Sequence, residues 1–131
     1  MAQHCRRWFQ TSCPELIIPV PLHPRRLRWR GFNQSVLLGR EVGRAWRIPL
    51  DPFVLTRKTE TRPQSSLSLK ERQPNVRGAF SVAPRRSVKS LRLLLVDDIY
   101  TSGATVNECT RVLLRSGARD VQVLTLARTV S

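Results

Sequence analysis

The sequence predicts an α/β domain with a mostly parallel sheet flanked by helices. Short apolar runs alternate with segments of helical periodicity, in the order strand, helix, strand, long loop, strand, helix, strand. The run SLRLLLVDD (90–98) is apolar enough to be buried on both faces, as strands of parallel sheets are. A chain of 131 residues also fits one compact domain, which we expect to span 1–131.

The N-terminal half contains two helical and two strand signals. Residues 1–11 look helical but lack an N-cap, and prolines bound the strand ELIIPVPL at 15–22, which we expect to end in a loop at 23–31. The helix expected at 33–47 has Asn33 or Ser35 available as its N-cap. Its apolar stripe is formed by Leu38, Val42 and Ala45. A short strand is expected at 52–56.

The C-terminal half begins with a polar segment at 57–78, which is too long to be an idle connector and is typical of a lid, a binding loop or disorder. Strands are expected at 78–82, 90–98 and 120–128. Between the last two, residues 101–117 predict a helix that Gly117 ends. Its apolar face consists of Val106, Cys109, Thr110 and Leu113.

The composition restricts the partners and the location of the protein. A net charge of +14 and a pI of about 11.6 favour anionic partners, which include phosphorylated metabolites, nucleic acid and acidic lipid. No apolar run is long enough to span a bilayer and the N-terminus lacks a signal peptide, so we expect a cytoplasmic protein without membrane insertion. Cys5, Cys13 and Cys109 lack C-x-x-C spacing, so neither a disulfide framework nor a zinc site is predicted.

The segment VDDIYTSGAT (96–105) combines two kinds of chemistry at the end of a strand. Asp97 and Asp98 are placed where open α/β sheets bind ligands, and we expect the strand to break after them so that both carboxylates accept hydrogen bonds from ligand hydroxyls. Residues 101–105 lead into a helix N-terminus, with three hydroxyls and with Gly103 permitting close backbone approach to a phosphate. The pattern therefore predicts a ribose 5-phosphate site.

Two blander interpretations of this segment remain open. The first is an ordinary turn from strand to helix with a polar cap. The second is the receiver domain of response regulators, which also places paired acids after a strand. It requires a phosphoacceptor aspartate on a later strand, but Asp120 is the only aspartate downstream of Asp98.

VDDIYTSGAT resembles the phosphoribosyl pyrophosphate (PRPP) motif of type I phosphoribosyltransferases. Together with PVPLHPRRLRWRGFNQS, RPQSSLSLKERQPNVRGAF and the terminal LAR, it makes the chain similar to the ComF family, which includes GntX-like proteins. The resemblance implies a Rossmann-like type I phosphoribosyltransferase fold and a link to competence and DNA uptake. It also implies that 57–78 is a flexible hood, which closes during catalysis and excludes water.

The resemblance also assigns roles to individual residues. Asp97 and Asp98 would be the catalytic residues and would hold the ribose 2- and 3-hydroxyls. The 5-phosphate would be bound by Thr101, Ser102, Gly103, Ala104 and Thr105. Pyrophosphate would be bound after the first strand by Arg25, Arg26 and Arg30. Mg²⁺ would be held mainly by PRPP oxygens and water, without a direct protein ligand, while the ribose 5-phosphate group is transferred to an unknown acceptor.

The sequence departs from the family in one respect and leaves other functions open. ComF-like proteins usually carry an N-terminal zinc-ribbon region with C-x-x-C pairs that is absent here. The chain is therefore expected to be an N-terminally truncated domain, with a short family member as the alternative. One alternative is a catalytically inactive protein on the same fold that binds single-stranded DNA, with Trp29 stacking on bases between arginines. Another is a partner subunit or scaffold without a ligand. Further partners that we expect are a second copy of the chain or a competence protein.

Overall fold

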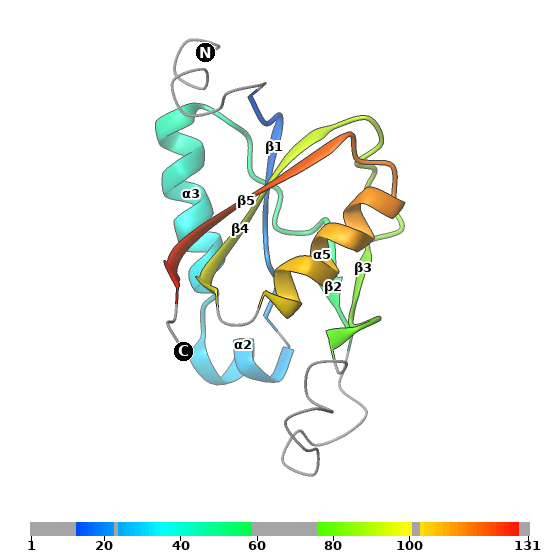
Figure 1. Ribbon diagram of the computed structural model, residues 1–131. Coiled ribbons are helices and arrows are strands. Elements are labelled where there is room, and N and C mark those ends of the chain that lie inside the picture. The colour runs from blue at the N-terminus through cyan, green and yellow to red at the C-terminus, as the bar shows by residue number, and fades with distance from the viewer. Residues whose placement is uncertain (1–12, 23, 59–75, 101–102, 129–131) are drawn as a thin grey trace.

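The computed structural model describes residues 13–22, 24–58, 76–100 and 103–128. In chain order, the elements are β1 (Leu16–Pro19), α2 (Pro24–Arg30), α3 (Gln34–Trp46), β2 (Leu55–Arg57), β3 (Phe80–Val82), β4 (Arg92–Tyr100), α5 (Ala104–Arg115) and β5 (Asp120–Arg128). They form a parallel sheet with helices on both faces and a smaller antiparallel pair beside it (Figure 1). The expected fold class is therefore confirmed.

The parallel sheet has β4 at its centre, in the strand order β1-β4-β5. Leu16 of β1 pairs with Leu93, and Asp120 of β5 pairs with Arg92. The residues Leu93–Val96 of β4 are at most 1% exposed. A strand with neighbours on both edges and helices on both faces has no solvated side, which explains its uninterrupted apolar sequence.

The two long helices cover opposite faces of this sheet (Figure 1). α3 contacts β1 and β4, whereas α5 contacts β4, β5 and β3. Successive side chains of a strand point to opposite faces, so the strand residues divide between two apolar clusters. The cluster on the α3 side contains Ile17, Leu94 and Val96. The cluster on the α5 side contains Ile18, Leu93 and Leu95, together with residues of β2 and β3.

α3 approaches β1 closely because Gly39 and Gly43 face the strand, where an added Cβ would lie 3.5 Å and 3.4 Å, respectively, from side-chain atoms of Ile17. A Cβ on Gly43 would also lie 2.7 Å from the backbone oxygen of Ile48, which is well inside normal contact.

At the start of α3, Oδ1 of Asn33 accepts a 2.9 Å hydrogen bond from the backbone N–H of Ser35. Asn33 is therefore the N-cap, which resolves the choice that the sequence left open.

Residues 24–30 form the helix α2, so the expectation of a loop at 23–31 is wrong. Pro24 occupies the first helical position, where its missing N–H costs nothing, and arginine and leucine are good helix formers. Gly31 ends the helix at φ +80°, and its N–H lies 2.7 Å from the carbonyl oxygen of Leu27. A proline at the start and a glycine after the end are sufficient helix signals.

Two smaller expectations also fail, for local reasons. The strand expected at 52–56 begins only at Leu55, because the backbone N–H of Phe53 donates to Oδ1 of Asp51 (2.9 Å) and forms a turn there. Ala45, expected in the apolar stripe of this helix, is exposed, and Trp46, four residues after Val42, packs against the α3-side cluster instead.

The strand expected at 120–128 is confirmed as β5. The helix expected at 1–11 lies outside the described residues, as does most of the 57–78 segment.

None of the helices in the described ranges is both long and apolar enough to cross a lipid bilayer.

Candidate functional site

Asp97 and Asp98 lie near the carboxyl end of β4, the central strand. The strand continues past them to Tyr100, and Asp97 pairs with Thr125 of β5. Our expectation that the strand breaks after Asp98 is therefore wrong. The ladder continues because β5 runs alongside β4 as far as Arg128. The acids are thus held by sheet hydrogen bonding on a rigid element, and they interact with each other through their side chains.

Ser35, in the first turn of α3, contacts the side chain of Asp97 and the backbone of Asp98. Its hydroxyl lies 3.5 Å from Oδ1 of Asp97 and accepts a 3.2 Å hydrogen bond from the backbone N–H of Asp98. Ser35 is buried, so water does not compete strongly for these contacts. Asn33 extends the same connection, since its Nδ2 donates to the carbonyl oxygen of Val20 at the end of β1 (3.1 Å).

Asp97 has an unusual protonation equilibrium. Burial, and after it a side-chain hydrogen bond with Asp98 and charge repulsion from Asp98, together raise its pKa to about 6. The hydroxyl of Ser35 and the backbone of Asp98 act in the opposite direction by stabilising the ionised carboxylate. A carboxyl group that titrates near neutrality beside a second acid, at the end of a parallel strand, is typical of a functional site.

The N-terminus of α5 follows the acids after a short connection. Gly103 is the N-cap residue at φ +82°, a left-handed conformation that favours glycine, and it is buried. Ala104 and Thr105 begin the first turn, where backbone N–H groups and the helix dipole favour an anion. Of the five residues expected to bind the phosphate, these three are placed at this helix start. Thr101 and Ser102 lie outside the described residues.

The expected pyrophosphate residues lie on α2 rather than in a loop. Arg25, Arg26 and Arg30 are all exposed, and α2 lies at the end of the molecule where β1 and β4 end and α5 begins (Figure 1). The structure therefore places a basic helix at the same end of the sheet as the two acids and the start of α5. Trp29 on the same helix is 87% exposed.

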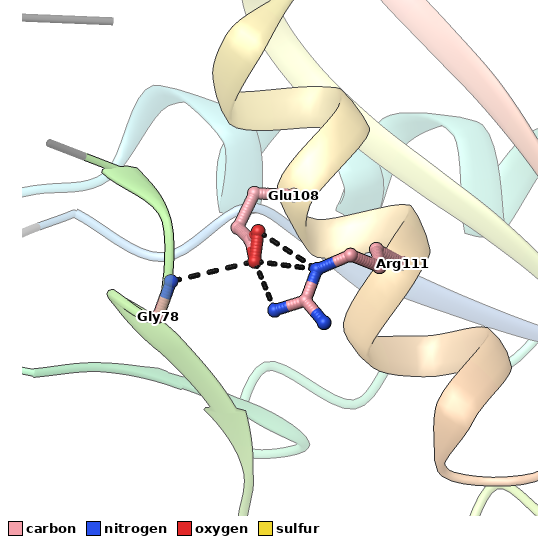
Figure 2. Close-up of polar contacts among 3 residues, drawn as sticks. All are labelled: Gly78, Glu108 and Arg111. Carbon is pink, nitrogen blue, oxygen red and sulfur yellow. Dashed lines mark hydrogen bonds and ion pairs between the residues drawn. The ribbon is translucent and has the colours of Figure 1, made fainter. Parts of the chain in front are cut away.

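A buried carboxylate, that of Glu108, joins α5 to Gly78, which lies two residues before the start of β3. Glu108 accepts hydrogen bonds from Nε of Arg111 (2.8 Å) and, at 3.4 Å, from the backbone N–H of Gly78, and it also contacts Nη2 of Arg111 (Figure 2). The hydrogen bond from Arg111 lowers the pKa of Glu108 below its usual range. Gly78 is the last residue of the 57–78 segment, so this clamp of Glu108, Arg111 and Gly78 holds one end of that segment against α5.

Ser35 and Glu108 are residues connected to the site that the sequence did not predict. Each is a polar residue on the sheet-facing side of an amphipathic helix, and this was the available signal. From the sequence, Ser35 is expected only as a helix cap, and Glu108 is adjacent to Cys109, which belongs to the predicted apolar face of the second helix.

Among the described residues, no three His, Cys, Asp or Glu side chains gather closely enough to hold a metal ion.

Curated relatives match nearly the whole chain. Competence protein F of Haemophilus influenzae is 40% identical over 124 residues, which are 94% of this chain and 54% of that protein. DNA utilization protein YhgH of Escherichia coli K12 is 39% identical over 127 residues, 97% of this chain and 55% of that protein. Competence protein ComFC of Streptococcus pneumoniae is 37% identical over 111 residues, 85% of this chain and 47% of that protein. The chain thus spans about half the length of the curated relatives that it matches.

Solved structures share the fold. An adenine phosphoribosyltransferase aligns with 97% of this chain and 64% of its own, with a TM-score of 0.61 and 12% identity. A purine phosphoribosyltransferase from Pyrococcus horikoshii aligns with 88% of this chain and 62% of its own, with a TM-score of 0.55 and 15% identity. No protein-family model matches the chain. Over the part that it spans, the chain is similar to Competence protein F, YhgH and ComFC, and it has the fold of the type I phosphoribosyltransferases.

Proposed function

We propose that this protein binds PRPP with Mg²⁺ and transfers its ribose 5-phosphate group to an acceptor with loss of pyrophosphate. The observation that carries the proposal is the arrangement at the carboxyl end of β4. Two interacting acids, tied to α3 by Ser35, are followed by a helix that begins at a buried glycine with positive φ. The homology and the shared fold support the same function.

The chain's own residues would divide the work between the parts of PRPP. Asp97 and Asp98 would accept hydrogen bonds from the ribose 2- and 3-hydroxyls, while the first turn of α5 would hold the 5-phosphate. The two carboxylates cannot bind phosphate themselves because like charges repel. The acids and the start of α5 would therefore bind different groups of PRPP, and their separation would fix the orientation of PRPP in the site. The exposed arginines of α2 would neutralise the pyrophosphate.

Mg²⁺ prefers oxygen ligands and keeps several of its waters. Within the described residues of the site, Asp97 and Asp98 are the carboxylates present, and both are assigned to the ribose hydroxyls. The ion would therefore be held by diphosphate oxygens and water, which fits a site without a third acidic ligand. When bound, it supplies positive charge that stabilises the leaving pyrophosphate.

In the proposed reaction, the bond between the anomeric carbon and the pyrophosphate oxygen breaks, and its electron pair leaves with pyrophosphate. A bond from the acceptor nucleophile to the same carbon forms, and the nucleophile loses its proton. The protein contributes orientation and charge stabilisation at both ends of the substrate. The acceptor itself is not identified by any described residue.

Calorimetric titration of PRPP with Mg²⁺ tests the proposal, with the double variant Asp97→Asn/Asp98→Asn as comparison. Wild-type protein is expected to bind PRPP, and the double variant is expected to lose binding while remaining folded by circular dichroism. Arg44→Gln, an exposed residue near the far end of α3, is the control and should bind normally. Absence of binding by folded wild-type protein would refute the proposal.

Single-stranded DNA binding is a second candidate, which the surface of α2 favours. Trp29 is 87% exposed between Arg28 and Arg30, and the chain carries a net charge of +14. An exposed aromatic ring among cations is the combination that stacks on bases and contacts phosphates. Binding of oligothymidylate should weaken steeply with salt, decrease in Trp29→Ala and be unaffected by Asp97→Asn. Salt-independent binding would argue against this candidate.

A further inference from the structure

A cavity of about 400 Å³ lies between α2, α3 and the turn at 51–53, which precedes β2. Its lining consists mainly of prolines and large apolar side chains contributed by these segments and by the end of β1. The α3 residues that line it, Val36, Leu37 and Arg40, are on a different side of the helix from Ser35, which contacts the acids. The cavity is thus a groove away from the two acids, and one of its walls is α2, the helix whose arginines are assigned to pyrophosphate.

The rim of this groove exposes large apolar side chains to solvent. Leu27, Phe32, Leu37 and Phe53 all line it, and they are between 42% and 66% exposed. They come from α2, the segment after it, α3 and the 51–53 turn, so the fold gathers residues that are distant in the sequence. A concentrated exposed apolar patch around a cavity is typical of an interaction site.

The polar side chains of the lining indicate that an apolar group enters the groove. Asn33 already uses both ends of its amide, since Nδ2 donates to the carbonyl oxygen of Val20 and Oδ1 accepts from the N–H of Ser35. The remaining polar side chain, Arg40, is exposed. A polar group buried between these side chains would lose hydrogen bonds to water without replacement, which is unfavourable.

The charges around the groove indicate an acidic partner. Arg40 belongs to the lining, and Arg26, Arg28 and Arg30 are exposed on the helix that carries Leu27. No residue of the lining is acidic. A second copy of this chain is a poor occupant, because each copy carries a net charge of +14 and the two would repel each other.

We propose that this groove is the docking site for an acidic peptide segment of a partner protein. Apolar side chains of the peptide insert between Leu37 and Phe53, and its carboxylates pair with the surrounding arginines. Apolar insertion supplies affinity, and charge complementarity supplies association rate and selectivity. A nucleic acid would satisfy the arginines but would place polar base edges against walls that offer few hydrogen-bond partners.

Selection from a random twelve-residue peptide library displayed on phage tests this proposal. The wild-type protein is the target, and the double variant Leu37→Ser/Phe53→Ser is used for counter-selection. Both side chains are substantially exposed, so the double variant is expected to fold. The control, Leu114→Ser/Val123→Ser, removes two similarly exposed apolar side chains, from α5 and β5, outside the groove lining.

Enriched peptides are expected to carry large apolar residues together with Asp or Glu. They should bind wild-type and control proteins equally and should bind the groove variant at least about tenfold more weakly, because two buried apolar contacts are lost. Arg40→Gln should weaken the same peptides, and raised salt should do so too. Failure to enrich any peptide on wild-type over the groove variant would overturn the proposal, as would enriched peptides without acids.

Two further measurements separate this proposal from the other functions. Oligothymidylate is titrated into the same variants, and a loss of DNA affinity in Leu37→Ser/Phe53→Ser would assign the groove to nucleic acid instead. PRPP is also titrated, and the groove variant should behave like wild-type, since neither substituted residue belongs to the PRPP site. The docking proposal and the PRPP proposal can therefore fail independently.

Discussion

Asp97→Asn should stabilise the folded protein at neutral pH. The structure raises the pKa of Asp97 from 3.8 to about 6, mainly through burial, so the folded state disfavours the charge that the residue carries at pH 7. Asparagine has nearly the same shape and no charge, and its amide can still contact Ser35. The substitution therefore removes an electrostatic cost while it keeps the packing.

The magnitude follows from the difference between the two pKa values. A difference of about 2 corresponds to about 3 kcal/mol at 1.36 kcal/mol for each pKa unit. This is an upper limit, because solvent screens the charge of this partly exposed carboxylate and because the asparagine must also be desolvated. Between pH 4 and 6 the folded state holds a proton that the unfolded state has released. The associated stability is thus fully present below pH 4 and is lost as pH rises through 6.

Urea denaturation at intervals from pH 4 to pH 8 measures this effect. The free energy of unfolding of Asp97→Asn, minus that of wild-type, should be lowest near pH 4 and rise to about 1–3 kcal/mol at pH 7. Taking the difference cancels the titration of other groups, including Glu108, whose lowered pKa acts in the opposite direction. Glu41→Gln is the control, since that carboxylate is 72% exposed in a surface pair with Arg44.

A difference that does not change with pH would show that Asp97 has an ordinary carboxyl equilibrium in the folded state. A variant that is less stable than wild-type at pH 7 would show that the charge of Asp97 is favourably paired in the free protein. Either result would refute the reasoning. The expected result would mean that the protein retains a destabilising charge at this position, as functional sites commonly do.

Three further predictions concern the core and the clamp. Glu108→Gln should lower the free energy of unfolding by about 1–2 kcal/mol in urea at pH 7, because the charged hydrogen bonds to Arg111 weaken, and an unchanged midpoint would contradict this role for the clamp. Gly43→Ala should lower it by about 1–3 kcal/mol, since the new Cβ would meet the backbone oxygen of Ile48 at 2.7 Å, whereas the exposed Ala45→Ser should change it little. Burial raises the pKa of the Cys109 thiol, so iodoacetamide at pH 8 should label it only after unfolding, as mass spectrometry of that peptide can show. Rapid labelling of folded protein would contradict its burial.

The elements that the sequence predicted well have strong local signals. The strand at 120–128 matches β5, and the apolar run of β4 was recognised as buried because a parallel strand between two helices needs no polar face. Asn33 and Gly103 are helix-terminal residue types, and both occupy helix starts in the structure. The loop expected at 23–31 is a helix instead, and the local signals for that helix are the proline at its start and the glycine after its end.

For the candidate site, the sequence by itself determined the order of the chemistry along the chain: two acids at the end of a buried strand, followed by glycine at a helix start. These features depend on neighbouring residues and therefore leave a local pattern. Only the tertiary structure decided that Ser35 lies against the acids and that Glu108 holds Gly78. It also brought Leu27, Leu37 and Phe53 to one groove. Such contacts join distant segments, and they depend on how helices and strands pack rather than on the residues beside them.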